Sequence, residues 1–195
     1  GLGRACAIAL AEAGANILIV SRTKKDLDQV SKIIKKFKVK CKSYTCDITN
    51  YNQIKSIVNQ QQRIDILVNN AGTNPYFGPV DKMPLDVYKK TMDINVNSAI
   101  SLSNLVYPIM KKQKSGSIIH ISSIEGIHPS KMMTAYNLSK TALIMLGNNQ
   151  AIEWGKDNIR VNVICPGYVK TKLSAALLEH ESSYKSFLKN TALGR

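Results

Sequence analysis

The stretch Ile118–Lys140, IIHISSIEGIHPSKMMTAYNLSK, determines how this chain folds and what chemistry it can perform. Its apolar start, which ends in two serines, predicts a buried β-strand, and a polar loop then leads to a helix that begins near Tyr136. A helix projects Tyr136 and Lys140, four residues apart, from the same face. The preceding strand would bring a serine hydroxyl to that face from the other side. A phenol, an ammonium group and a hydroxyl at one point form an acid–base device, because a nearby cation lowers the pKa of a phenol.

Short apolar runs alternate with helical patterns throughout the chain. The expected strands are Ile17–Val20, Lys42–Cys46, Ile64–Val68, Gly116–Ser122 and Ile159–Cys165. The expected helices run from Gly1 to about Ala13, Asp26 to about Phe37, Tyr51–Arg63, about Leu85 to Lys112, and from Tyr136 to about Gly155. This alternation predicts an α/β fold: a single domain over residues 1–195 with a doubly wound parallel sheet, helices on both faces and a ligand site at the strand C-termini.

Composition narrows the classes of protein that the chain can belong to. With 195 residues, 44% of them hydrophobic, the chain is long enough for one domain with a sizeable core. No apolar run reaches the roughly 18 residues that a membrane-spanning helix needs. The start of the chain lacks the pattern of a signal peptide. The four cysteines lack the paired spacing of metal ligands, so we expect no metal and a reducing, cytoplasmic location.

A formal net charge of +14 has two interpretations. It could form a surface for nucleic acid or another acidic partner, or it could be an ordinary lysine-rich solvated surface. The lysines are spread over several segments without interleaved aromatic residues, which favours the second interpretation. We therefore expect no nucleic-acid and no membrane partner.

Two motifs place the chain near a known family. The segment YNLSK, with Ser123 thirteen residues before Tyr136, resembles the Tyr-x-x-x-Lys and Ser signature of the short-chain dehydrogenase/reductase family. Residues 69–72, Asn-Asn-Ala-Gly, match that family's NNAG motif and follow a predicted buried strand. The resemblance covers essentially the whole chain. It implies a Rossmann-like fold and an oxidoreductase that transfers hydride between NAD(P)(H) and a carbonyl or alcohol.

The resemblance also implies catalytic roles. Tyr136 would exchange a proton with the substrate oxygen, and Ser123 would polarise that oxygen; spacing to Tyr136 selects Ser123 over its neighbour Ser122. Lys140 would lower the pKa of Tyr136 and bind the nicotinamide ribose. Asn95 would hold a water in the proton path, although it could also be a polar residue on a helix surface. His120 lies in a predicted strand, where a histidine is more often packed than catalytic.

The cofactor would lie near the start of the chain. Gly1, Leu2 and Gly3 precede a helix, as the last part of the family's Thr-Gly-x-x-x-Gly-x-Gly pattern does, and a helix N-terminus suits the pyrophosphate. We therefore expect the sequence to begin partway through this motif and to lack the strand before it. It is also expected to lack the helix and strand with which family members usually end.

Three residues after the first predicted strand, Ser21, Arg22 and Thr23, predict a preference for NADP(H) over NAD(H). An acidic residue here would bind the adenine ribose of NAD, whereas an arginine accommodates the 2′-phosphate of NADP. Arg22 could alternatively be a solvated loop residue.

The resemblance extends the cofactor site to the other strand ends. Asp47 and Ile48 would flank the adenine, although Asp47 could equally be a helix-capping or turn residue. The further cofactor-binding residues that the resemblance implies are Asn70, Ala71, Gly72, Tyr136, Lys140, Pro166, Gly167, Val169 and Thr171. Residues 172–189 would form a helical flap over the substrate site.

The substrate stays open between branches of the family. The TNPYFG segment after NNAG and the SR pair at Ser21 resemble the NADP-dependent carbonyl and retinal reductases. A 3-oxoacyl-[acyl-carrier-protein] reductase is the alternative, since an acidic acyl carrier protein would suit a basic surface. That branch has Gly-Gln-x-Asn-Tyr where this chain has Met133-Thr134-Ala135-Tyr136. A dinucleotide-binding regulatory protein is the non-enzyme alternative. We expect a homodimer or homotetramer that uses Leu102–Met110 and Thr141–Trp154.

Overall fold

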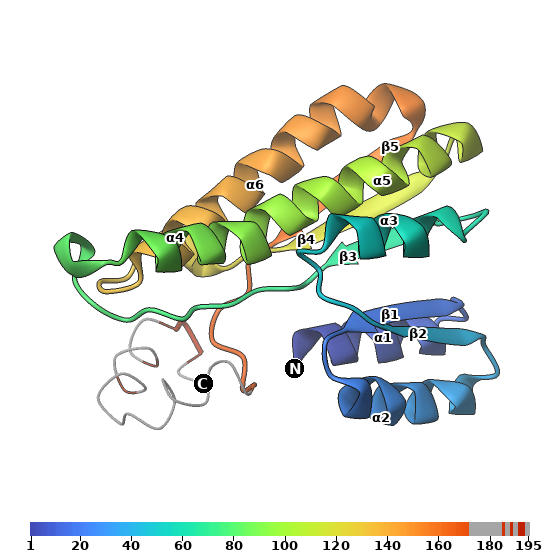
Figure 1. Cartoon of the computed structure of the whole chain (residues 1–195), viewed down its shortest axis with the longest axis horizontal. Helices are drawn as coiled ribbons and strands as arrows, with labels where there is room; N and C mark the ends of the chain where they lie inside the picture. The colour runs from blue at the N-terminus through green and yellow to red at the C-terminus, as the bar shows by residue number, and fades with distance from the viewer. Residues whose placement is uncertain (172–184, 186–187, 189–190, 194–195) are drawn as a thin grey trace.

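The structure, a computed structural model, describes residues 1–171, 185, 188 and 191–193 (Figure 1). Helices and strands alternate as predicted. The helices are α1 (Leu2–Glu12), α2 (Lys24–Ile34), α3 (Tyr51–Asn59), α4 (Leu85–Met92), α5 (Ser98–Gln113) and α6 (Thr134–Trp154). The strands are β1 (Ile17–Ser21), β2 (Cys41–Thr45), β3 (Ile66–Asn69), β4 (Gly116–Ile121) and β5 (Ile159–Ile164).

All strand pairs are parallel. β1 pairs with β2 from Ile17↔Cys41 onward, and β4 pairs with both β3 and β5. The connection between two paired strands contains α2, then α4 and α5, and then α6, as parallel strands require a crossover. Parallel strands end at the same edge, so the segments after β3, β4 and β5 begin side by side.

The strands form two groups where the sequence predicts one sheet. One group has the order β1-β2 and the other β3-β4-β5, with no hydrogen-bonded pairing between β1 and β3. Leu18 in β1 and Ile66 in β3 are 37% and 40% exposed. A continuous parallel sheet would bury both strands on both faces, so this exposure agrees with the division into two groups. The strand order 3-2-1-4-5-6 of dinucleotide-binding folds has its first strand between two such groups.

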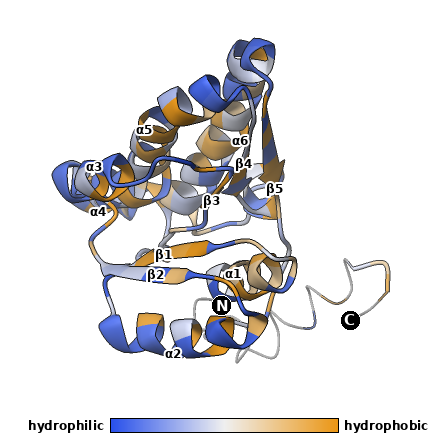
Figure 2. Cartoon of the chain, turned by 90° about the vertical axis from the view of Figure 1, so that its right-hand side faces the viewer, coloured by the Kyte–Doolittle hydropathy of each residue, from blue (hydrophilic) through white to orange (hydrophobic). Residues whose placement is uncertain are grey.

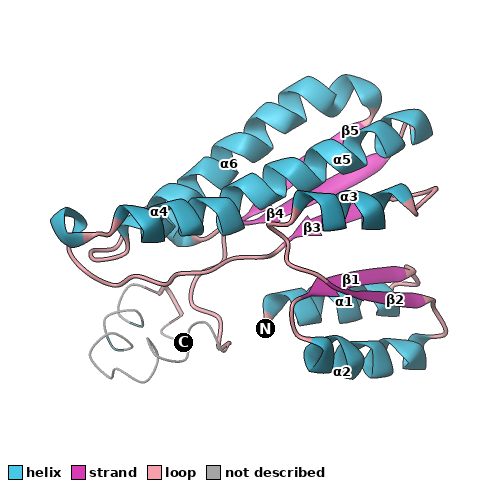
Figure 3. Cartoon of the chain, viewed as in Figure 1, coloured by secondary structure: helices cyan, strands magenta, loops and turns pink. Residues whose placement is uncertain are grey.

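Helices cover both faces of the strands, which is the doubly wound arrangement that the sequence predicts (Figure 3). One core lies between α1, α2 and β1, and includes Ala11, Ile17 and Ile34. The larger core joins α3, α5 and α6 to β4 and β5. Its buried members are Cys46, Ile54, Ile57, Val58, Val106, Met110, Ile118, Trp154, Ile159 and Val161. In α2 the buried residues are Leu27, Val30 and Ile34, and the helix carries both hydrophilic and hydrophobic residues (Figure 2).

Several predicted boundaries shift. The helix expected to reach Arg63 ends at Asn59, and the helix expected over 26–37 is α2 followed by a 3₁₀ turn at Lys35–Phe37. The long helix expected from Leu85 is α4 and α5, which are joined by a π-helical turn at Asp93–Asn97. Among the described helices, none is long and apolar enough to cross a membrane. Most of the predicted flap lies outside the described residues.

Candidate active site

The two serines after β4 have different partners. Ser122 is buried, and its hydroxyl donates to the carbonyl oxygen of Lys140 at 2.7 Å, which ties the end of β4 to α6. Ser123 has extended backbone angles (φ −163°, ψ 158°), its Oγ accepts from the Glu125 amide at 3.2 Å, and its side chain is close enough to Tyr136 to lower the pKa of the phenol. Adjacent residues of an extended segment face opposite sides, as the sequence predicts. Ser123 therefore lies on the side of the Tyr136 hydroxyl, and Ser122 has a structural contact.

Burial raises the pKa of Tyr136 above its ordinary value. The hydrogen bond with Ser123 lowers this pKa, whereas the charges of Glu125 and Tyr168 raise it further. Lys140 is not among the groups that shift this pKa, so the expected lowering by Lys140 stays a prediction. The Lys140 Nζ lies over the Tyr136 ring, 5.5 Å from its centroid, and desolvation of the phenolate has the largest effect on the Tyr136 pKa.

Lys140 is one of the most enclosed charged residues of the described chain. It is 4% exposed, and its Nζ donates to the carbonyl oxygen of Ile121 at 2.8 Å. Burial lowers its pKa from 10.5 to about 8, and the nearby Cys165 thiol acts in the opposite direction. A Cβ added at Gly72 would lie 3.4 Å from the Nζ. Gly72 therefore leaves room beside the ammonium group, between the ends of β3 and β4.

Asn95 lies in the π-helical turn between α4 and α5 and is 1% exposed. Its Oδ1 accepts from the Thr73 amide at 2.7 Å, and its Nδ2 donates to the Thr73 carbonyl oxygen at 3.0 Å and to Ser139 Oγ at 2.9 Å. The side chain thus joins the loop after β3 to α6, and it is not a surface residue. Such turns occur frequently at functional sites. The predicted role in holding a water stays a prediction.

The start of α1 meets the residues predicted to bind the cofactor. A Cβ added at Gly3 would lie only 2.6 Å from Asn70 Nδ2, and one added at Gly1 would lie 3.7 Å from Thr171. Side chains at these positions would fill a space between the helix and the strand ends. No side chain caps the first turn of α1 and none in it is acidic, so its amide groups suit an anion. These residues fit a dinucleotide phosphate.

The adenosine end of the predicted site follows β1 and β2. The Thr23 amide donates to Ser21 Oγ at 3.2 Å, and Arg22 is exposed. Asp47 Oδ1 accepts from the amide and hydroxyl of Thr49 at 2.9 and 2.8 Å. These hydrogen bonds hold the pKa of Asp47 below its ordinary value; burial acts in the opposite direction, and the charge of Arg22 adds a lesser lowering. Asp47 therefore forms a turn, and Asn50 caps α3 by accepting from the Gln53 amide.

The segment after β5 lies beside the segment after β4. The Ile124 amide donates to the carbonyl oxygen of Pro166 at 3.0 Å, so the segments that follow β4 and β5 are fastened together. Gly167 and Val169, which follow Pro166, are exposed. The predicted cofactor residues Ile48, Ala71 and Leu2 lie at the ends of other strands and at the start of α1. The predicted catalytic and cofactor residues therefore gather along one edge of the strands.

Comparison with known proteins agrees with this geometry. The family model described as short chain dehydrogenase matches residues 1–182. The chain belongs to the short-chain dehydrogenase family. It is 36% identical over 201 residues to human "Dehydrogenase/reductase SDR family member 4", with 100% of this chain and 72% of that protein covered. Members of this family are oxidoreductases that bind NAD(P)(H), act on small molecules and are commonly oligomeric.

Solved structures of short-chain dehydrogenases share this fold. NAD⁺-bound xylitol dehydrogenase is 29% identical with a TM-score of 0.90, covering 100% of this chain and 82% of that one. A gluconate 5-dehydrogenase from Burkholderia cenocepacia, in complex with NADP and tartrate, is 27% identical with a TM-score of 0.94, covering 100% and 78%. One neighbour carries NAD⁺ and the other NADP, so the family leaves the cofactor preference open.

One residue of the short-chain dehydrogenase site, Glu125, has no counterpart in the sequence prediction. Glu125 is 6% exposed and acts on the pKa of Tyr136, but only its position two residues after Ser123 could have indicated this. Asn69 donates to Ser103 Oγ and contacts His120 Nδ1, and His120 Nε2 contacts Gln150 Oε1. His120 is fully buried, which agrees with a packing role.

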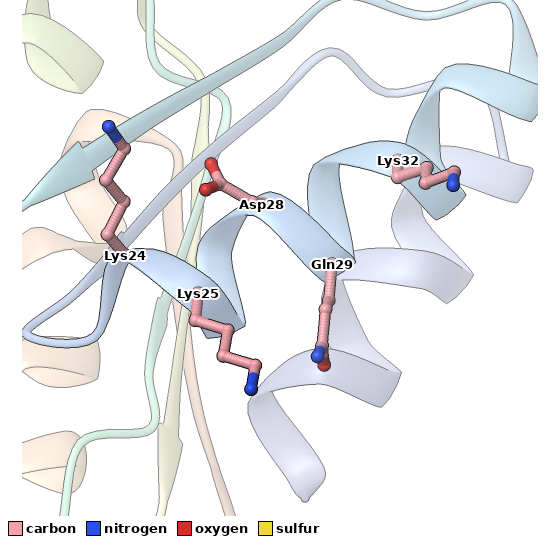
Figure 4. A pocket seen from close by; sticks show the side chains of 5 residues that line it. All are labelled: Lys24, Lys25, Asp28, Gln29 and Lys32. Atoms are coloured by element: carbon pink, nitrogen blue, oxygen red, sulfur yellow. The ribbon is translucent and has the colours of Figure 1, made fainter.

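The hollow drawn in Figure 4 lies away from the predicted catalytic residues. It measures about 570 Å³ and is lined by Lys24, Lys25, Asp28, Gln29 and Lys32, all on α2. These residues form a lysine-rich face of α2 that begins directly after Thr23. In the described part of the chain, no group of His, Cys, Asp or Glu side chains gathers as metal ligands do.

Proposed function

We propose that this short-chain dehydrogenase interconverts a ketone or aldehyde and the corresponding alcohol with NADP(H). The observation that carries the proposal is that the Ser123 side chain lies close enough to Tyr136 to act on the pKa of the phenol, with the Lys140 Nζ over the tyrosine ring. Two hydroxyl groups at one point can both bond a carbonyl oxygen, and one of them can give it a proton.

Each of the three catalytic residues has its own role in the reaction. Ser123 donates a hydrogen bond to the substrate oxygen and orients it, and Tyr136 gives that oxygen a proton in the direction of reduction. Because burial raises its pKa, Tyr136 is neutral at physiological pH and has the proton to give. Lys140, beside Gly72, is placed to bind a hydroxyl of the cofactor ribose. The bound cofactor supplies the hydride that the substrate carbon accepts.

NADP(H) preference is supported by charge at the end of β1. Ser21, Arg22 and Thr23 contain no acidic residue, and the lysine-rich face of α2 starts at the next position. An arginine fork and nearby lysines suit a 2′-phosphate. Arg22→Ala should weaken NADPH binding more than NADH binding, measured by fluorescence titration of both. Equal weakening of the two affinities would refute the preference.

The activity is tested by following NADPH oxidation by the full-length protein against a panel of ketones and aldehydes. Tyr136→Phe is the control, because it keeps the ring and removes only the proton donor. Removal of a general acid costs about 10²- to 10⁴-fold in rate, with NADPH affinity retained. Equal turnover by the unmutated protein and Tyr136→Phe would contradict the mechanism.

The net charge of +14 favours one second candidate, a 3-oxoacyl-[acyl-carrier-protein] reductase, whose carrier protein is acidic. An acetoacetyl thioester in the same panel separates the two. Preference for the thioester, lost at high salt when it is attached to the carrier, would favour the second candidate.

We also propose a cytoplasmic homodimer or homotetramer assembled through α5 and α6. Leu138, Met145 and Ile152 are spaced seven residues apart on α6 and are 48%, 58% and 81% exposed, which supports a helix face that a second copy covers. Light scattering of the unmutated protein and of a Met145→Lys, Ile152→Lys double variant tests the assembly. Cell fractionation tests the location.

A further inference from the structure

Six exposed lysines gather where α2 ends and β2 begins. We call them the lysine cluster, and they are Lys32, Lys35, Lys36, Lys38, Lys40 and Lys42. Residues 29–46 contain these six lysines and no acidic residue, so a net charge of +6 out of +14 lies on less than a tenth of the chain. A large share of the positive charge is therefore concentrated in one region.

The main chain under the lysine cluster is fixed. Apolar residues between the lysines pack against the core of α1, α2 and β1, namely Ile34, Phe37, Val39 and Cys41. The Lys40 amide donates to Asn16 Oδ1 at 2.9 Å, and the Lys40 carbonyl oxygen accepts from the Ile17 amide at 2.8 Å. The lysine cluster is therefore a surface on an ordered base, with its apolar neighbours inside and its ammonium groups in water.

The lysine cluster lies at the edge of the strands opposite the predicted catalytic and cofactor residues. β2 begins at Cys41 and ends at Thr45, and the predicted cofactor residue Asp47 follows its end. The turn between α2 and β2 lies at the end of the molecule away from the start of α1 (Figure 1). The predicted cofactor site therefore does not account for this charge.

The lysine cluster has no ion-pair partner in the described part of the chain. Like charges held on one surface repel each other, and this repulsion lowers the stability of the folded protein. A partner of opposite charge removes the repulsion when it binds. The lysine cluster therefore has the properties of a surface for an anionic partner.

A hollow of about 430 Å³ beside the lysine cluster indicates the kind of anion. It is lined by Asp28, Ser31, Lys32, Lys35, Cys41 and Ser43. The amines and hydroxyls can donate hydrogen bonds to carboxylate oxygens. Asp28 repels a uniform row of phosphates, whereas it can accept from the donor groups of a protein chain. This mixture fits a protein better than a nucleic-acid backbone.

Two other classes of anionic partner fit less well. Single-stranded nucleic acid stacks its bases on aromatic rings, but Phe37 and Tyr44 are half-buried and pack against the cores. The lysine cluster also contains no arginine, the residue that binds phosphate groups bidentately. A bilayer surface takes up apolar side chains beside basic ones, and residues 29–46, all of them described, contain no exposed large apolar residue.

We propose that the lysine cluster is a docking surface for a carboxylate-rich segment of an acidic protein. The ammonium groups pair with the carboxylates of that segment, and the hollow takes one of its side chains. A partner bound at this edge leaves the opposite edge, with Ser123 and Tyr136, open to cofactor and substrate. The docking surface thus anchors the enzyme, and it is independent of the proposed reaction.

The deciding measurement uses the full-length protein and fluorescently labelled poly-L-glutamate, with binding followed by fluorescence anisotropy. A triple variant, Lys32→Gln, Lys35→Gln and Lys42→Gln, removes half of the lysine cluster. The matched control, Lys89→Gln, Lys90→Gln and Lys112→Gln, removes the same charge from exposed positions on α4 and α5. Thermal unfolding checks that both variants are folded.

We expect the cluster variant to bind poly-L-glutamate about tenfold more weakly than the unmutated protein, and the control variant at most about twofold more weakly, because three modest exposed charge pairs are lost only in the first. Affinity should fall as salt rises. Equal weakening in both variants, or no binding by the unmutated protein at low salt, would overturn the inference. Tighter binding to duplex RNA or to phosphatidylserine vesicles would overturn it in favour of another partner.

Lysine acetylation provides a second readout that needs no variant. Poly-L-glutamate should slow the reaction of the lysine cluster with acetic anhydride, measured residue by residue by mass spectrometry, and leave Lys89, Lys90 and Lys112 unprotected. Equal protection of both groups of lysines would contradict a defined docking surface, even if the cluster variant does not fold.

Discussion

Replacing Lys140 with methionine should stabilise the fold at neutral pH while it removes activity. Lys140 is 4% exposed, and burial lowers its pKa from 10.5 to about 8, so the folded protein holds a charge that it disfavours. Methionine has a similar length and no charge. Its Sδ and methyl group would occupy the space beside Gly72 without binding a ribose hydroxyl. Sites that sacrifice stability for chemistry behave in this way.

The pKa shift sets the size of the effect. A difference of one pKa unit corresponds to about 1.4 kcal/mol, so the shift from 10.5 to about 8 makes protonated Lys140 destabilising by about 3 kcal/mol. The lost hydrogen bond to the Ile121 carbonyl oxygen offsets about 1 kcal/mol of this. Lys140→Met should therefore raise the free energy of unfolding by about 2 kcal/mol at neutral pH.

The pH dependence follows from the direction of the shift. Below pH about 8, Lys140 is protonated in both states and the full cost applies; above pH 10.5 it is neutral in both and the cost is absent. Between these values the unfolded chain binds more protons, so the stability of the unmutated protein rises with pH relative to the variant. Urea unfolding of both proteins at several pH values from 7 to 10 measures this difference, with exposed Lys156→Met as the control.

Two results would refute this reasoning. One is a Lys140→Met variant less stable than the unmutated protein at pH 7, which would mean that other contacts of the ammonium outweigh its desolvation. The other is a stability difference that stays constant from pH 7 to 10. Lys156→Met should show neither the gain nor the pH dependence, since Lys156 is exposed and water already solvates its charge.

Three further predictions concern the neighbourhood of this site. Ser123→Ala should lower the rate by about 10²-fold or more with little change in stability. Ser122→Ala should lower the free energy of unfolding by about 1 kcal/mol, because its hydrogen bond to the Lys140 carbonyl oxygen is lost, and should affect the rate less. Kinetics and urea unfolding that show the opposite pattern would reverse the assignment of the two serines. Gly126→Ala places a Cβ 2.7 Å from the Lys140 carbonyl carbon, so thermal unfolding should show a loss of about 1–3 kcal/mol together with a lower kcat, and an unchanged Tm would contradict the close packing. Burial lowers the pKa of His120 below 6.5, so the unmutated protein should lose stability as pH falls below about 6.5, and His120→Gln should lose less; equal slopes in urea unfolding would show that His120 is not held neutral.

Much of the architecture was predictable because its signals are local. Alternating apolar runs and helical patterns predict the strands and helices. The errors are at ends such as Asn59, where fraying and capping decide a boundary, and at the π-helical turn Asp93–Asn97 that divides one expected helix into α4 and α5. The division of the strands into two groups was not predictable from these runs, because it depends on which strand edges pair. Hydrogen bonds between strands join residues that are far apart in sequence.

For the candidate site, the sequence by itself determined which side chains share one face. The spacing of Tyr136 and Lys140 on α6, and the alternation of Ser122 and Ser123 after β4, follow from backbone geometry alone. Only the tertiary structure decided the electrostatics: the raised pKa of Tyr136, the lowered pKa of Lys140 and the buried charge of Glu125. A pKa depends on how much water surrounds a group and which charges from other elements face it, and spacing along the chain contains neither.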